Sequence, residues 1–109
     1  MNKKIIIIGG GIAGYTLANE LSTHNNLDII LIEKENIGGT CLNKGCIPTK
    51  SLLYSSLNNK NLKQILEKTK RVISFLRKSI NINYINDEAI IESKNSIFLK
   101  KSKKKIFFD

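Results

Sequence analysis

The stretch IIIIGGGIAG at residues 5–14 decides the fold of this 109-residue chain. Its four isoleucines form a β-branched run that ends at glycine, which is typical of a strand buried on both faces of a parallel sheet. Gly9, Gly11 and Gly14 have the spacing G-x-G-x-x-G, and apolar residues then recur at helical intervals. The pattern predicts a strand, a tight glycine turn and a helix.

A second apolar run, IILI at residues 29–32, leads to Glu33, nineteen residues after Gly14. Strand, glycines, helix, strand and terminal acid in this order are the fingerprint of a dinucleotide-binding unit. We expect Gly9 to permit the tight turn, Gly11 the approach of a pyrophosphate, and Gly14 close packing of the helix on the sheet. The helix N-terminus offers N–H groups to phosphates. Glu33 is expected to bind a ribose, and the alternative is a solvated charge after a strand.

The two cysteines, Cys41 and Cys46, lie in the stretch GGTCLNKGCIPTK at residues 38–50. Their spacing among glycines indicates a redox couple, and the alternative is two small buried apolar side chains. Positions i and i+5 of an ideal helix lie on different faces and roughly 8 to 9 Å apart. A disulfide needs Cα atoms within about 7 Å. Pairing would therefore require a local distortion of the helix, for which Gly45 supplies the backbone freedom.

Together these motifs resemble the flavin-dependent pyridine nucleotide–disulfide oxidoreductases. The family pattern G-G-T-C-L-N-x-G-C-I-P-[ST]-K is present at residues 38–50, and the IPTK sequence at its end is most similar to the dihydrolipoamide dehydrogenase branch. The resemblance is dense over residues 4–55 and thin over residues 60–109. It implies an α/β fold, a Rossmann-like FAD-binding domain with a parallel sheet and a β-meander, truncated before its next parallel strand.

The resemblance also implies cofactors and roles. FAD would be the cofactor and NAD the co-substrate, with no metal site. Cys41 and Cys46 would be the catalytic pair, Cys41 exchanging with the substrate dithiol and Cys46 passing electrons to the flavin. Cys41 is expected to be the more reactive thiol, because it lies at a predicted helix N-terminus. Lys44 replaces the family's usual valine, and its ammonium either lowers a thiolate pKa or points into solvent, which we favour. The residues implied in cofactor binding are Gly9, Gly11, Ile12, Ala13, Gly14, Glu33, Lys34, Gly38, Gly39, Thr40, Cys41 and Lys50.

The length predicts one domain, residues 1–109, as a partial FAD-binding domain. Because the family's enzymes are several times longer, we expect this chain to be an N-terminal part, inactive alone and completed by a separate chain. The complete enzyme would be a homodimer that oxidises the dihydrolipoamide of an acyltransferase. The alternatives are a non-functional remnant of a degraded reading frame and a small FAD- or ADP-binding module. The single histidine, His24, lies in a polar turn and is expected at the surface rather than in catalysis.

For the rest of the chain, the sequence predicts secondary structure only in outline. It predicts a helix over residues 40–56, a break at 58–61, an amphipathic helix over 62–76, a strand within 80–85, a hairpin over 89–100 and a third short strand at 106–108. In the family's strand order the run at residues 5–8 lies between neighbours, one of which is missing here. That strand is therefore expected to present an unpaired edge.

The net charge of +9 comes almost entirely from lysine, and Ile, Lys and Asn together make up 48 of the 109 residues. This bias is typical of the codon usage of an AT-rich genome, so the basic character of the chain says little about its function. The lysine run at residues 100–105 has no interleaved aromatic residue, and a solvated turn explains it better than nucleic-acid binding. No export signal or membrane span is visible. Two thiols in such a chain predict a cytoplasmic protein with no nucleic-acid or membrane partner.

Overall fold

The computed structural model describes residues 1–58 and 61–109. The break predicted at residues 58–61 includes residues 59–60, which lie outside the described residues. The chain divides into two compact units, Met1–Ile37 with Ile82–Asp109, and Gly38–Asn81. The elements of the first unit are β1 (Lys3–Ile8), α1 (Ile12–Leu21), β2 (Leu27–Glu33), β3 (Tyr84–Asn86), β4 (Ala89–Ser93), β5 (Ser96–Leu99) and β6 (Lys104–Phe107). Those of the second are α2 (Gly39–Lys44), α3 (Cys46–Ser56) and α4 (Leu62–Ser79).

The first unit contains a parallel sheet in the order β1-β2-β3, which confirms the predicted α/β fold. The β1–β2 register runs from Lys3 opposite Leu27 to Ile8 opposite Ile32. Among the described strands β1 lies at the edge, as expected, although Asp109 pairs with its beginning through Asp109 N–H to Lys4 O at 3.0 Å. The strand predicted within residues 80–85 is shorter in the structure, where β3 begins only at Tyr84. The reason is that α4 continues to Ser79 and that Ile80 is its C-cap residue.

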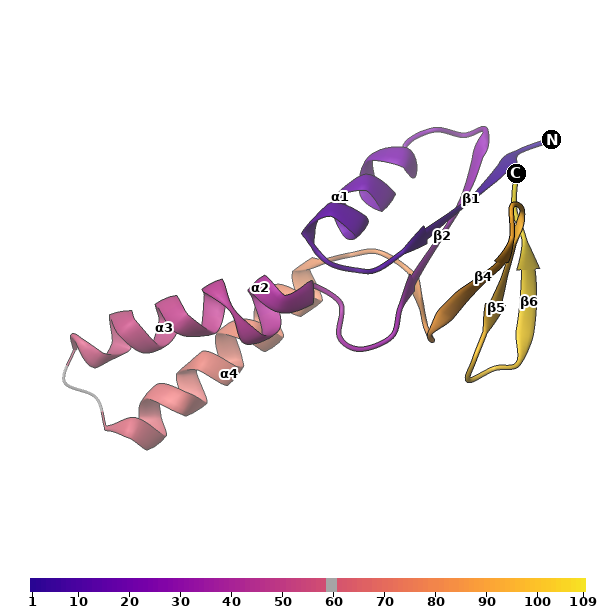
Figure 1. Cartoon of the computed structure of the whole chain (residues 1–109). Coiled ribbons are helices and arrows are strands. Elements are labelled where there is room, and N and C mark those ends of the chain that lie inside the picture. The colour runs from indigo at the N-terminus through magenta and orange to yellow at the C-terminus, as the bar shows by residue number, and fades with distance from the viewer. Residues whose placement is uncertain (59–60) are drawn as a thin grey trace. The chain divides into compact units, whose positions relative to one another are not determined.

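Two layers cover the sheet, α1 on one face and the β-meander on the other (Figure 1). Neighbouring residues of a strand face opposite sides, so Leu31 and Ile32 of β2 belong to different layers. Both are 1% exposed, and Ile32 packs with Ile97 and Leu99 of β5 in one core cluster. Burying each such side chain contributes about 1.5–3 kcal/mol. The apolar run of β2 is therefore buried on both faces. The run of β1, for which the sequence predicted this, is less buried: Ile7 is buried, but Ile8 is 49% exposed.

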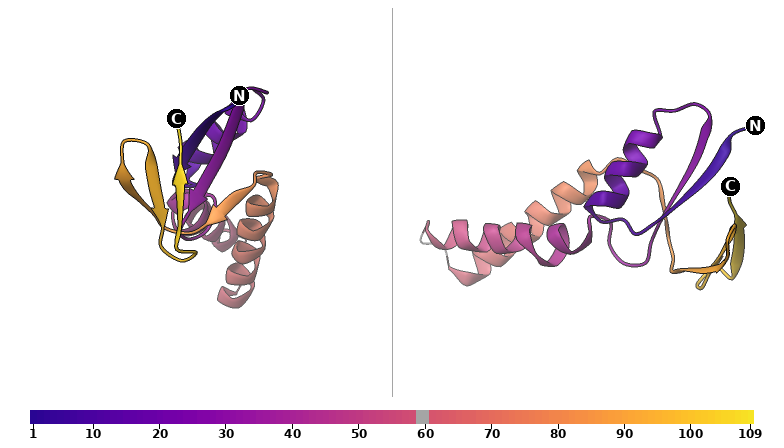
Figure 2. Two further views of the ribbon diagram at one scale, coloured as in Figure 1. Left: turned by 90° about the vertical axis from the view of Figure 1, so that its right-hand side faces the viewer. Right: turned by 45° about the horizontal axis from the view of Figure 1, so that its top comes forward.

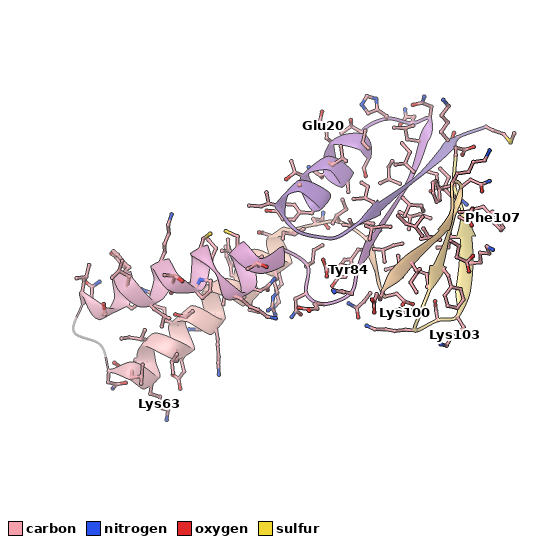
Figure 3. All side chains as sticks on the ribbon, in the orientation of Figure 1. Glu20, Lys63, Tyr84, Lys100, Lys103 and Phe107 are labelled. Atoms are coloured by element: carbon pink, nitrogen blue, oxygen red, sulfur yellow. The ribbon has the colours of Figure 1, made fainter. Side chains whose placement is uncertain are left out.

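β4, β5 and β6 form a separate antiparallel sheet, the predicted meander. Figure 3 shows Lys100 and Lys103 at the β5–β6 turn, where the lysine run is exposed. Lys100 pairs with Glu88 at 2.9 Å and Lys105 pairs with Glu92 at 2.7 Å. The lysine run is thus an exposed turn and strand start with ion pairs to Glu88, before β4, and to Glu92 in β4, in agreement with the simpler of the two explanations.

In the second unit α3 and α4 lie side by side (Figures 1 and 2). Asn61 caps α4, since its side chain accepts a hydrogen bond from Gln64 N–H at 3.0 Å. Thr69 is buried and its hydroxyl donates to Ser51 Oγ at 3.0 Å, so a polar contact joins the two helices. The amphipathic pattern correctly predicted α4, which extends three residues beyond the predicted end at residue 76.

The single helix predicted over residues 40–56 is wrong. Gly45, with φ −125° and ψ −111°, separates α2 from α3. A Cβ at this position would lie 3.0 Å from the Thr40 carbonyl oxygen and 3.3 Å from Cys41 Cα. The backbone approaches that closely only because residue 45 has no side chain, and a new helix begins with Thr49 N–H donating to the Gly45 carbonyl at 3.1 Å.

Candidate functional site

The glycine turn between β1 and α1 is built from backbone contacts. Gly9 has φ +106°, a conformation that favours glycine, and its N–H donates to Ile32 O at 2.8 Å. A Cβ on Gly14 would lie 1.8 Å from the Gly9 carbonyl oxygen and 3.6 Å from Ile7 Cγ2. The geometry agrees with the predicted close packing at Gly14, and it shows that the turn itself, as well as the sheet, requires glycine there.

The N-terminus of α1 is open to an anion. Gly11 is the N-cap residue and supplies no side-chain hydrogen bond, and the first turn contains no acidic residue. Ile12 and Ala13 are exposed. The first N–H groups of a helix have no partner within the helix, and they lie at its positive end. This ten-residue helix therefore offers donors of the kind that bind phosphate.

Glu33, at the end of β2, is tied to the glycine turn. Its Oε2 accepts a hydrogen bond from Gly10 N–H at 2.7 Å, and its Oε1 accepts one from Glu35 N–H at 2.8 Å. The residue is half-buried, so it is not a freely solvated charge. A carboxylate has about four lone-pair positions. Two are used by these backbone donors, and the others remain for a ligand hydroxyl.

A cavity of about 280 Å³ opens at the carboxyl ends of β1 and β2. Ligands of parallel α/β sheets bind at this edge. Two of the lining residues come from the connection between β3 and β4 and a third is the first residue of β4, and the sequence reasoning missed all three. The only signal for them was the expected strand order, which places the end of β3 beside Glu33. The lining residues are Ile8, Gly9, Ile32, Glu33, Lys34, Asp87, Glu88 and Ala89.

Asp87 is a buried carboxylate in the wall of this cavity, 3% exposed. It accepts hydrogen bonds from the backbone N–H groups of Glu88 at 2.7 Å, Lys101 at 2.8 Å and Ser102 at 3.0 Å. Desolvation alone would raise its pKa, but the hydrogen bonds outweigh burial and lower the pKa of Asp87 to about 2. Asp87 therefore fixes the β5–β6 turn against the cavity wall as a permanent anion at neutral pH.

The two cysteines meet at the break between α2 and α3. Both are free thiols, Cys41 half-buried and Cys46 exposed. The neighbouring side chain of Cys46 raises the pKa of Cys41; desolvation adds to this effect, and the positive charge of Lys50 opposes it. The expectation of a depressed pKa at a helix N-terminus is therefore not supported for Cys41. The break at Gly45 supplies the predicted local distortion and brings together thiols that a continuous helix would separate.

The other predicted residues divide between the two units. In the first, Lys34 is exposed and lines the cavity. In the second, Gly38 and Gly39 have φ of +104° and +68° at the entry to α2, a conformation that favours glycine. Thr40 in α2 and Lys50 in α3 are exposed.

His24 and Lys44 are also exposed, in agreement with the surface positions favoured for both.

Within residues 1–58 and 61–109, no group of three or more His, Cys, Asp or Glu side chains is placed to hold a metal ion. Over the same described residues, no helix has both the length and the apolar character needed to cross a bilayer.

The chain matches the family described as pyridine nucleotide-disulphide oxidoreductase over residues 3–109. It is 46% identical over 71 residues to a dihydrolipoyl dehydrogenase of Bacillus subtilis (strain 168), a match that covers 65% of this chain and 14% of the relative. It is 41% identical over 92 residues to the dihydrolipoyl dehydrogenase of Buchnera aphidicola subsp. Acyrthosiphon pisum, covering 80% of this chain and 19% of the relative. A solved structure, the Cu(II) complex of the HOCl-induced flavoprotein disulfide reductase RclA from Escherichia coli, is similar with a TM-score of 0.84 and 31% identity. That match covers 95% of this chain and 26% of the RclA chain, so this chain spans about a quarter or less of the length of these three proteins.

Proposed function

This chain belongs to the pyridine nucleotide-disulphide oxidoreductase family, and from that premise we propose that it holds part of an FAD site and the redox thiols of an enzyme resembling dihydrolipoyl dehydrogenase. Residues 1–109 would be a partial FAD-binding domain. The observation that carries the proposal is the position of Cys41 and Cys46 on the two sides of the Gly45 break, where the Gly45 backbone lies against Cys41 and the Cys46 side chain is near enough to raise the pKa of Cys41. A pair of adjacent thiols can alternate between dithiol and disulfide, which is the chemistry that a disulfide oxidoreductase needs.

The thiol chemistry follows from that pair. In the oxidised state, a thiolate of dihydrolipoamide attacks Cys41 Sγ; a new S–S bond forms to the substrate, and the bond to Cys46 breaks, leaving Cys46 as a thiolate. The second substrate thiolate then attacks the substrate sulfur of the mixed disulfide, which closes the lipoamide ring and releases Cys41. Two electrons have moved from the substrate to the cysteine pair, and the substrate has lost two protons.

The residues present fit an FAD molecule. The uncapped N-terminus of α1 suits a pyrophosphate, and the free acceptor positions of Glu33, beside the 280 Å³ cavity, suit an adenosine ribose. Bound FAD would take two electrons from the reduced thiol pair and pass them as a hydride to NAD. The exposed side chain of Cys46 supports its assignment to the flavin side of the pair. Gly38, Gly39, Thr40 and Lys50 remain proposed cofactor-binding residues of the chain.

The whole enzyme's partners are part of the same proposal. The relatives named dihydrolipoyl dehydrogenase are five or more times the length of the matched segment, so further regions would bind NAD and supply the base that deprotonates the substrate. We expect a homodimer that takes the dihydrolipoamide of an acyltransferase as its substrate, in the cytoplasm. The chain alone would bind FAD weakly, because it supplies only the contacts named above.

The experiment is oxidation and reduction of the purified chain. Mild oxidation should give an intramolecular disulfide, seen as the loss of two mass units, and dihydrolipoamide should restore both thiols faster than an equal thiol concentration of a monothiol. Cys41→Ser and Cys46→Ser are the matched controls and should form no such bond. FAD should bind and be lost on dialysis. A folded chain that binds ADP and FAD but forms no disulfide would be a nucleotide-binding module, and the oxidoreductase proposal would be wrong.

A further inference from the structure

The side chain of Asn86, in β3, is hydrogen-bonded to the turn after Glu33. Its Nδ2 donates two hydrogen bonds, to Glu33 O at 3.1 Å and to Glu35 O at 2.8 Å. Asp87 N–H also donates to Glu33 O, at 3.1 Å. One carboxamide thus joins the end of β2 to the turn that follows it, across more than fifty residues of sequence.

A carboxamide suits this position for a chemical reason. The amide NH₂ group has two donors, and here two carbonyl oxygens face it. A carboxylate in the same place would oppose both oxygens with negative charge, and an aliphatic side chain would leave them without these donors. The Oδ1 of Asn86 points to the other side, where Lys101 Nζ donates to it at 3.3 Å. The orientation of the amide is therefore set by its neighbours on both sides.

This turn determines where the carboxylate of Glu33 lies. The Glu35 N–H that the turn presents is bonded to Glu33 Oε1, while Glu33 Oε2 is bonded to Gly10 N–H. Movement of the Glu35 backbone would shift one of the two donors that orient the carboxylate. A relay of hydrogen bonds therefore leads from Asn86, through the turn and Glu33, to the glycine turn that opens α1.

We propose that Asn86 is a positioning residue of the nucleotide site: it holds the turn at residues 33–35 so that the Glu33 carboxylate remains on Gly10 N–H and keeps its other acceptor positions available to a ribose. The inference rests on the proposed nucleotide site and deepens it. The side-chain hydrogen bonds of Asn86 join Glu33, Glu35 and Lys101. Its effect on binding is therefore expected to pass through Glu33.

The test is a double-mutant cycle on the full chain, with ADP as the probe. Asn86→Leu should weaken ADP binding about fivefold, the equivalent of one lost hydrogen bond. In the Glu33→Ala background the same substitution should change binding less than twofold, because its route of action is gone. Asn83→Leu, an exposed asparagine preceding β3, is the matched control and should leave binding unchanged. Equal losses in the two backgrounds would overturn the inference.

A second readout needs no ligand. The Gly10 amide proton, bonded to a carboxylate, should resonate well downfield, and Asn86→Leu should shift it upfield whereas Asn83→Leu should not. An unchanged Gly10 resonance in folded Asn86→Leu protein would overturn the inference, and so would failure of that variant to fold, since the role would then be structural. If wild-type chain binds no ADP, the proposed nucleotide site fails, while the Gly10 signal still decides the role of Asn86.

Discussion

Replacing Gly14 by alanine tests the packing on which the glycine turn depends. The added Cβ would lie 1.8 Å from the Gly9 carbonyl oxygen, against about 3.4 Å for an ordinary contact, so the atoms must separate by about 1.6 Å. Neither partner can move alone. The oxygen belongs to a turn fixed by a φ of +106°, and Gly14 lies within α1. Relief therefore requires α1 to shift away from β1 and β2.

The magnitude is the difference of two effects. Alanine gains about 1 kcal/mol over glycine inside a helix, whereas overpacking a rigid contact costs about 3 kcal/mol or more. We expect a net loss of about 2 kcal/mol in the free energy of unfolding. For a chain of this length that corresponds to a fall of about 8 to 16 °C in Tm. ADP binding should weaken as well, because the N-terminus of α1 moves with the helix.

Gly10→Ala is the matched control in the same turn. Its Cβ would meet chiefly Ile37 Cδ1, at 2.5 Å, the end of a flexible side chain that can rotate away. We therefore expect a change within about 1 kcal/mol, since the lost chain entropy of the unfolded state offsets the mild crowding. Urea unfolding followed by circular dichroism, with thermal melts, measures both variants. Equal stability of Gly14→Ala and Gly10→Ala would refute the reasoning.

Two further predictions concern the ionisable groups of the two units. The pKa of Asp87 is lowered to about 2, so the stabilisation from its hydrogen bonds is full above the unfolded pKa near 4 and is lost as pH falls toward 2. Asp87→Asn should therefore lower Tm at pH 7 and reduce the dependence of Tm on pH between 4 and 2. An unchanged dependence of Tm on pH would show that Asp87 does not stabilise the β5–β6 turn in this way. In the reduced, flavin-free chain, Cys46 is exposed, whereas Cys41 is half-buried and has a raised pKa. Limiting iodoacetamide should therefore label Cys46 first. Mass mapping that finds Cys41 labelled first would show that the neighbouring thiol does not control the reactivity of Cys41.

Local pattern was sufficient for the parts of the fold that depend on neighbouring residues. The isoleucine run, the spacing of Gly9 and Gly14, and the amphipathic period of α4 correctly predicted β1, the turn and the long helix. They succeeded because strand alternation, a positive φ and a helical face are set within a few residues. The resemblance added the meander, which the hairpin pattern of β4 and β5 also indicated.

The same local reasoning failed at Gly45. A helical period over residues 40–56 gave one helix, because the pattern cannot show that the Gly45 backbone lies against the Thr40 carbonyl. Cys41 does lie in the first turn of a helix, α2, as predicted, but its pKa is not lowered there. The structure instead puts a second thiol beside it, and this contact raises the pKa.

The sequence by itself determined that this chain builds a strand–glycine–helix unit, that Glu33 ends the second strand, and that two thiols lie five positions apart. Only the tertiary structure decided what these groups touch. The parallel order β1-β2-β3 brings Asn86 and Asp87 beside Glu33, more than fifty residues away in the chain. The reason is physical: hydrogen-bond partners in a parallel sheet come from distant segments, and their pairing depends on strand order and register rather than on local spacing.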